Sequence, residues 1–252
     1  MTAFTRVDMI MLERLLPDGK FENDIYGAAY RLLDAANMIG FLFAGLLLPM
    51  FARMIKEKST ELKALHTFSF ELILCLTIPL AMGIFLYRYD IMVLLYDDAL
   101  PYWGDILGYL ILNLVPISGI YIAGTLLLAN GSHWHLIKIY ALGFVINFAL
   151  NLYLIFEYKS AGASLATLVT QFSVWMALLW LLRREKGFTV MRKRFAAFLL
   201  LLGIVFFIAP NLLALINLDW RIKFIGIGAL LGMMSISYLL LSFDIKSILS
   251  KK

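Results

Sequence analysis

The chain has 252 residues, of which 62% are hydrophobic and only 15% are charged, and its formal net charge is +5. A soluble fold of this length does not need so much apolar sequence, and the mean hydropathy of +0.87 indicates a membrane protein. The basic residues gather in segments expected on one side of a membrane. The positive charge therefore gives no reason to expect a nucleic-acid partner.

The first two apolar segments contain charges that a lipid-facing helix would not carry. Segment 2–16 is too short to span a bilayer, and segment 25–52 is long enough. Each charge at mid-bilayer depth costs at least about 2.5 kcal/mol, so four of them close together predict a polar cavity. The four residues are Arg6, Asp8, Arg31 and Asp34.

Six further apolar segments follow, each long enough to cross about 30 Å of hydrocarbon at about 1.5 Å per residue. The predicted fold class is an all-α polytopic membrane protein with about seven full transmembrane helices and a truncated N-terminal helix. The predicted spans are 25–52, 64–87, 105–129, 135–156, 161–182, 195–216 and 222–241.

The distribution of basic residues predicts the topology, because cytoplasmic loops carry the excess of Lys and Arg. The segments expected outside hold only Lys20, Arg88, Lys159, Arg221 and Lys223. Those expected inside hold Arg53, Lys56, Lys58, Lys63, Lys138, Arg183, Arg184, Lys186, Arg192, Lys193, Arg194, Lys246, Lys251 and Lys252. We therefore expect the C-terminus in the cytoplasm.

Polar residues within the later spans form a second group of candidates. Glu71 lies inside span 64–87 and is a candidate for proton uptake. Helical spacing places polar side chains on two stripes, which either join helices through hydrogen bonds or line a cavity for sugar hydroxyls. The stripes are Tyr140, Asn147 and Asn151, and Ser164, Thr167 and Gln171.

The sequence offers no convincing catalytic, metal or cofactor site. Asp97 and Asp98 are adjacent rather than opposed, which favours solvated loop charges over a catalytic pair. His133 and His135 do not share a helix face and have no carboxylate or cysteine nearby, which argues against a metal site. The alternative is an integral membrane enzyme of envelope glycan assembly. Substitution of Asp97 and Asp98 tests it, because lost glycan synthesis with normal flipping would favour the enzyme.

Two groups of blocks resemble a known family. Arg6–Leu12, Ile25–Leu32 and Leu48–Ala52 resemble the start of the second half of polysaccharide (O-antigen, Wzx-type) flippases of the multidrug/oligosaccharidyl-lipid/polysaccharide exporter superfamily. Asn147–Ile155 and Ala161–Thr167 are similar to that family's later asparagine-containing helix and glycine-alanine helix entry. The order of the blocks fits helices seven to fourteen, the second lobe of a MATE-like flippase.

The resemblance implies a function in the bacterial inner membrane. Two six-helix lobes would rock about a cavity and move a polyprenyl-pyrophosphate-linked oligosaccharide across the bilayer for cell-surface polysaccharide biosynthesis. Arg6 and Arg31 are the candidates for pyrophosphate contact, although both also suit internal ion pairs. The candidates for contact with the sugars are Asn147, Asn151 and Gln171. The expected partners are this lipid-linked substrate and membrane lipids, with no enzyme activity.

The chain also departs from the family pattern. Asp24 stands where the family usually has glycine, and Phe156 and Lys159 replace a proline and a glycine of the later outer turn. Residues 1–182 are expected to form the C-terminal lobe, and 183–252 a basic linker with two additional helices. The family's first lobe is absent, so we expect a split or wrongly started gene, a lobe from a separate chain, or a non-functional remnant.

The expected depth of Arg6, Asp8, Arg31 and Asp34 in the membrane suggests how these four charges pair. Measured from Lys20, Asp8 and Arg31 lie at nearly equal depth on neighbouring antiparallel helices, as do Arg6 and Asp34. Two crosswise ion pairs, Asp8 with Arg31 and Arg6 with Asp34, are therefore predicted. Asp8, Asp34 and Glu71 are accordingly the candidates for buried charge pairing or ion coupling.

Overall fold

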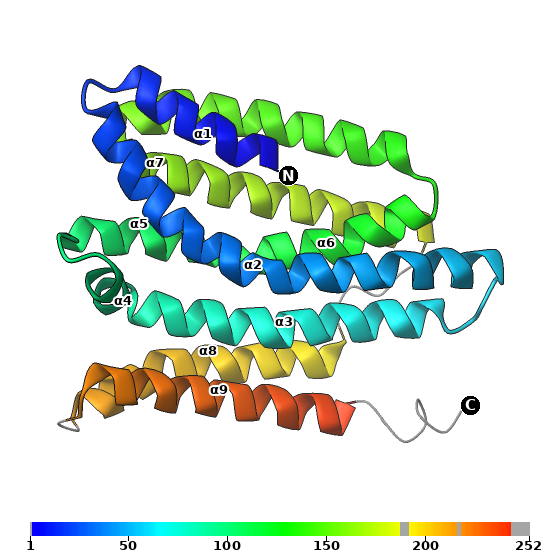
Figure 1. Ribbon diagram of the computed structural model, residues 1–252. Coiled ribbons are helices and arrows are strands. Elements are labelled where there is room, and N and C mark those ends of the chain that lie inside the picture. The colour runs from blue at the N-terminus through cyan, green and yellow to red at the C-terminus, as the bar shows by residue number, and fades with distance from the viewer. Residues whose placement is uncertain (1, 187–191, 216–217, 243–252) are drawn as a thin grey trace.

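A computed structural model describes residues 2–186, 192–215 and 218–242, except for the side chains of 2–6, 185–186, 210 and 213–214. The elements it describes are helices, most of them running side by side along one direction (Figure 1). They are α1 (Thr2–Leu15), α2 (Gly19–Lys56), α3 (Leu62–Leu86), α4 (Arg88–Leu95), α5 (Pro101–Leu112), α6 (Leu114–Ala129), α7 (His133–Lys186), α8 (Lys193–Ala214) and α9 (Trp220–Ser242). The predicted all-α polytopic class is confirmed.

Five stretches are long and apolar enough to cross a membrane, by length and composition: 19–56, 62–86, 101–129, 133–184 and 220–242. The fourth contains two antiparallel helices, because the backbone of Lys159 is non-helical and reverses the chain between 133–158 and 160–186 (Figure 1). We call these the first and second halves of α7. Helix α8 has 22 residues, close to the 23 residues of α9.

The predicted span 105–129 is two helices rather than one. Helix α5 ends at Leu112 and α6 begins at Leu114, with Asn113 between them. Pro116 has no N–H to donate to the Leu112 carbonyl, which removes one helical hydrogen bond at this point. The two helices together still form one stretch of spanning length.

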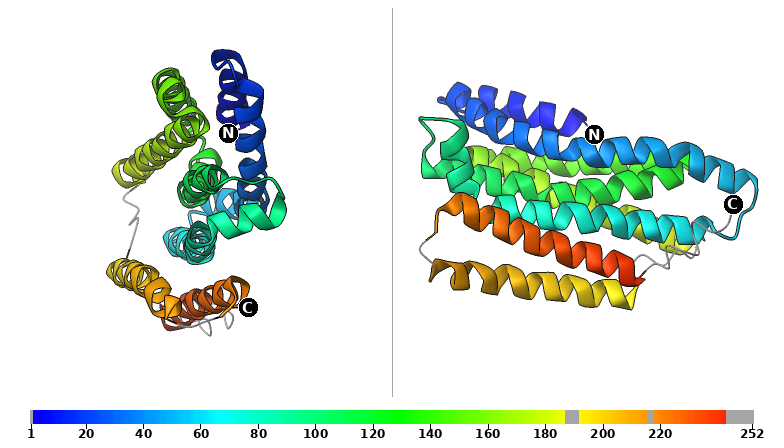
Figure 2. Two further views of the ribbon diagram at one scale, coloured as in Figure 1. Left: turned by 90° about the vertical axis from the view of Figure 1, so that its left-hand side faces the viewer. Right: turned by 60° about the horizontal axis from the view of Figure 1, so that its bottom comes forward.

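The helices α1, α2, α5, α6 and α7 pack together, and α3 packs against α5 and α6. Helices α8 and α9 form a pair beside α3, away from α1 and α2 (Figure 2). The turns after α1 and α4 and the reversal at Lys159 lie at one end of the bundle, which we call the outer end because topology predicts it outside (Figure 1). Apolar side chains fill the interior, including Leu12, Ile25, Leu107, Phe70 and Phe195.

Candidate functional site

A buried carboxylate lies where α1 meets α2 and both halves of α7. The side chain of Asp8 is 0% exposed. The Tyr26 hydroxyl donates a hydrogen bond of 2.9 Å to Asp8 Oδ2, and the Asn151 amide donates one of 2.5 Å to Oδ1. The Thr167 hydroxyl also donates to Oδ2. All three donors are neutral, so the negative charge of Asp8 is hydrogen-bonded but not balanced by them.

The two asparagines of the first stripe belong to the same network. Asn151 Nδ2 lies 3.1 Å from Asn147 Oδ1, and Asn147 Nδ2 lies 3.5 Å from Thr167 Oγ1. Asn147, Asn151 and Gln171 are at most 2% exposed. For the two asparagines, these hydrogen bonds fit the first of the two alternatives, polar side chains that join helices. The contact of Asn147, Asn151 and Gln171 with sugar hydroxyls stays a prediction.

The predicted ion pair between Asp8 and Arg31 does not form. Arg31 is exposed, and among the described residues it has no ion-pair partner. The depth argument placed the turn at Lys20, whereas α1 ends at Leu15 and α2 begins at Gly19, so Asp8 lies nine residues and Arg31 fourteen residues from the turn centre at Pro17. It also omitted rotation about the helix axis. Arg31 follows Tyr26 by five residues, which is about 140° around an α-helix, so it points away from the side that faces Asp8.

Arg31 belongs instead to an exposed polar face of α2. Asp24, Arg31 and Asp34 are all exposed and follow i, i+7, i+10 spacing, which places them on one side of the helix. Arg31 lies twelve residues into α2, or about 18 Å from its outer end. Charges at this depth require a polar surrounding rather than lipid. The side chain of Arg6 lies outside the described residues, so its pairing with Asp34 stays a prediction.

Glu71 is joined to the C-terminal helix pair. Its side chain is 0% exposed, and Arg192 donates to both of its oxygens, with 2.8 Å between Nε and Oε1. The Tyr238 hydroxyl of α9 donates a third hydrogen bond of 2.8 Å. The negative charge of Glu71 is thus balanced by a guanidinium, and the contact ties α3 to the start of α8 and to α9.

The outer end has a second polar network that the sequence reasoning missed. Glu22, 3% exposed, accepts hydrogen bonds from the Ser160 N–H at 3.2 Å, the Ser160 hydroxyl at 2.6 Å and the Tyr102 hydroxyl at 3.1 Å. Lys159 Nζ lies 2.5 Å from Asp18 Oδ2 and 3.7 Å from Glu22 Oε1. The Lys159 ammonium holds the pKa of Asp18 below its usual value.

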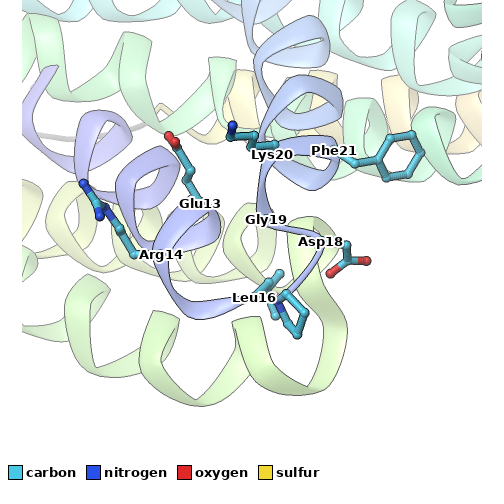
Figure 3. A pocket seen from close by; sticks show the side chains of 8 residues that line it. Glu13, Arg14, Leu16, Asp18, Gly19, Lys20 and Phe21 are labelled. Carbon is cyan, nitrogen blue, oxygen red and sulfur yellow. The ribbon is translucent and has the colours of Figure 1, made fainter.

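A surface pocket of about 500 Å³ lies beside this network, at the turn between α1 and α2 (Figure 3). Its lining mixes both signs of charge on exposed side chains and does not include Asp8. It is lined by Glu13, Arg14, Leu16, Pro17, Asp18, Gly19, Lys20 and Phe21. We assign it no role.

The residues weighed for catalysis remain apart from these networks. Asp97, Asp98, His133 and His135 are exposed. Among the described residues, His, Cys, Asp and Glu nowhere gather in a group of three that could hold a metal ion.

The family model described as Lipid II flippase MurJ matches residues 26–228, from α2 into α9. No curated protein matches the chain.

Proposed function

The chain belongs to the Lipid II flippase MurJ family, and on that premise we propose that it moves a polyprenyl-pyrophosphate-linked glycan across the bacterial inner membrane. Flipping of a lipid-linked precursor is the function of the family, whose members are transporters rather than enzymes. The family match gives no support to the O-antigen subtype suggested by the sequence blocks. We therefore propose a lipid II-like precursor as the first substrate to test and an O-antigen precursor as the second.

Arg31 is the proposed pyrophosphate contact. A desolvated guanidinium offers planar donors that suit phosphate oxygens. The observation that carries the proposal is that Arg31 is exposed on a polar face of α2 at membrane depth, without an ion-pair partner among the described residues. Arg6 is proposed as a second contact, on its position in α1 alone.

Asp8 is the proposed coupling residue. A carboxylate that is fully buried among neutral donors is costly when ionised. A proton or an alkali cation would neutralise it, and Asp8, Thr167 and the Asn147 and Asn151 amides supply oxygen atoms for a cation. Binding and release of that charge would favour different packings of α1, α2 and α7, which couples an ion gradient to the motion of the lobe.

The exposed polar face also supports a two-lobe transporter. A cavity wall that carries Asp24, Arg31 and Asp34 needs a polar surface opposite it. We propose that residues 1–182 form one lobe, that 183–252 add the linker and helices α8 and α9, and that a second lobe from the same gene or another chain completes the cavity.

Reconstitution tests this function directly. The chain would be placed in proteoliposomes alone and together with the N-terminal six-helix lobe of a MurJ family member, with fluorescent lipid II or a lipid-linked O-antigen unit in the membrane. We expect flipping only with both lobes, and its loss in Arg31→Gln. Inactivity with both lobes and both substrates would contradict the proposal and favour a remnant, whereas chemical turnover of a glycan would favour the enzyme.

A further inference from the structure

Two helical hairpins build the Asp8 site, and their turns meet at the outer end (Figure 1). Asp8 and Tyr26 lie on the two arms of the α1–α2 hairpin. Asn151 and Thr167 lie on the two halves of α7, each eight residues from Lys159. At about 1.5 Å per residue, the site is about 12 Å inside the turn of the second hairpin.

The two turns are joined by polar contacts and not by apolar packing alone. Asp18 and Glu22 of the first hairpin contact Lys159 and Ser160 of the second, and Tyr102 of α5 completes the group through Glu22. We call these five residues the outer clasp. Because the first hairpin carries Asp8 and Tyr26 and the second carries Asn151 and Thr167, the clasp fixes how closely these groups can approach one another.

Lys159 has an unusual place in the clasp. Its backbone has φ 52° and ψ −130°, a conformation that residues with a side chain rarely adopt. A glycine would fit this turn without strain. The lysine ammonium, however, reaches a carboxylate on the neighbouring hairpin, which a glycine cannot do.

The clasp combines a weak part with a strong part. The side chains of Lys159 and Asp18 are 46% and 41% exposed, and ion pairs with that exposure break and re-form easily. Glu22 is buried and accepts three hydrogen bonds, so the closed arrangement is well defined. A contact that is specific when closed and inexpensive to open suits a gate.

We propose that the outer clasp is the outer gate of the Asp8 site, with Lys159 as its positioning residue. When the clasp is closed, the hairpins shield Asp8 from the outer solution. When the clasp opens, the coupling proton or cation passes between the hairpins to the carboxylate. The inference rests on the proposed coupling role of Asp8, and Lys159 acts through the hairpins without touching the ion.

The test measures access to Asp8 in the full chain. Right-side-out membrane vesicles are treated with a water-soluble carbodiimide and glycine ethyl ester, and modification of Asp8 is quantified by peptide mass spectrometry. We expect slow modification in the wild type and about tenfold faster modification in Lys159→Met. This factor corresponds to a clasp that raises the equilibrium constant for closing about tenfold. The control Lys20→Met removes an exposed charge at the same end and should leave the rate unchanged.

Two further variants separate charge from backbone strain. Lys159→Arg keeps the cation and should keep modification slow. Lys159→Gly relieves the backbone but removes the cation, and we expect it to be modified as fast as Lys159→Met. Slow modification of Lys159→Gly would overturn the role of the lysine charge. Glu22→Gln should also accelerate modification, and if it fails to accumulate in the membrane, the exposed Lys159 variants still carry the test.

The gate and the proposed function fail in different ways. Unchanged Asp8 modification in Lys159→Met and Lys159→Gly overturns the gate, whatever the transport assay gives. If Asp8 can be fully modified without loss of flipping in the two-lobe proteoliposomes, the coupling role of Asp8 is wrong. Accelerated modification together with loss of flipping on modification supports both.

Discussion

Glu71 of α3 and Arg192, just before α8, form a partly buried two-point ion pair between residues that are 121 positions apart in the chain. Helices α8 and α9 contact the rest of the described structure mainly through α3, so this pair lies at their principal attachment. Aromatic packing surrounds it, with Phe198 stacked on Tyr238 at 4.6 Å between ring centroids. One carboxylate, Glu71, thus binds groups from both the start of α8 and α9, in addition to the apolar packing between these helices and α3.

Substitution of Glu71 should loosen that attachment. Glu71→Gln is expected to lower the free energy of unfolding by about 2 kcal/mol, the range of hydrogen bonds to charged groups. Arg192 is 33% exposed, which reduces the effect below the about 3–5 kcal/mol of a fully buried pair. A double-mutant cycle of Glu71→Gln and Arg192→Gln in detergent micelles measures the coupling. Arg194→Gln is the control, and strict additivity of the first two substitutions would contradict the pair.

The single cysteine reports on the same attachment. Cys75 is one helical turn after Glu71 and is 1% exposed. We expect little labelling by a small maleimide in the wild type and several-fold faster labelling in Glu71→Gln and Tyr238→Phe, because the helix pair then opens more often. Equal labelling in all three proteins would show that α8 and α9 stay in place without the pair.

Arg31 should matter for transport and not for folding. Its side chain is exposed, so Arg31→Gln is expected to change the free energy of unfolding by no more than about 0.5 kcal/mol. Loss of a charge-assisted phosphate contact should reduce flipping about ten- to hundredfold. Arg31→Lys keeps the charge without the planar donor array and should be intermediate. Arg14→Gln, at the outer turn, should flip normally; an equal loss there would point to a general charge effect.

The side of the membrane on which the C-terminus lies can be tested directly with a fusion reporter. The basic residues gather at the α2–α3 turn, around the end of α7 and beyond α9. A reporter fused after Lys252 should therefore be active only as a cytoplasmic fusion, by the positive-inside rule. Periplasmic activity would reverse the assignment of outer and inner ends, and the clasp at Lys159 would then face the cytoplasm.

Much of the fold follows from the sequence, because span length and apolar content are local properties. The blocks Ile25–Leu32 and Ala161–Thr167 even contain Tyr26 and Thr167, which bind Asp8. The sequence alone could not show which residue of α2 contacts Asp8, because Tyr26 and Arg31 lie on different sides of the same helix. The depth argument measured from Lys20 matches Asp8 with Arg31, whereas the turn between α1 and α2 is centred at Pro17, which is nine residues from both Asp8 and Tyr26.

The outer clasp was out of reach for a related reason. Glu22 and Ser160 are 138 residues apart, and each alone is unremarkable near the end of a helix. In the sequence, Lys159 is one of the few basic residues expected outside, and it stands where the family pattern has glycine. That departure was a usable signal, because a side chain where the backbone favours glycine suggests a contact that compensates for the strain.

Asp8 and Arg31 are expected to act independently of one another rather than as an ion pair. An ion pair would make Asp8→Asn severely destabilising, and Arg31→Gln would then restore folding. The structure instead surrounds Asp8 with neutral donors and leaves Arg31 exposed. We expect Asp8→Asn to fold with a modest loss of stability, because an amide oxygen still accepts from Tyr26 or Thr167, and to lose ion-coupled flipping.

Unfolding of Asp8→Asn, Arg31→Gln and the double variant measures this directly. The two effects should add within about 0.5 kcal/mol, as they do for residues without contact. Each substitution should impair transport for its own reason, Asp8→Asn by removing the ionisable group and Arg31→Gln by weakening substrate binding. A coupling of about 1 kcal/mol or more would mean that the two side chains meet in another conformation of the lobe, and Arg31 would then neutralise Asp8 in place of a proton or cation.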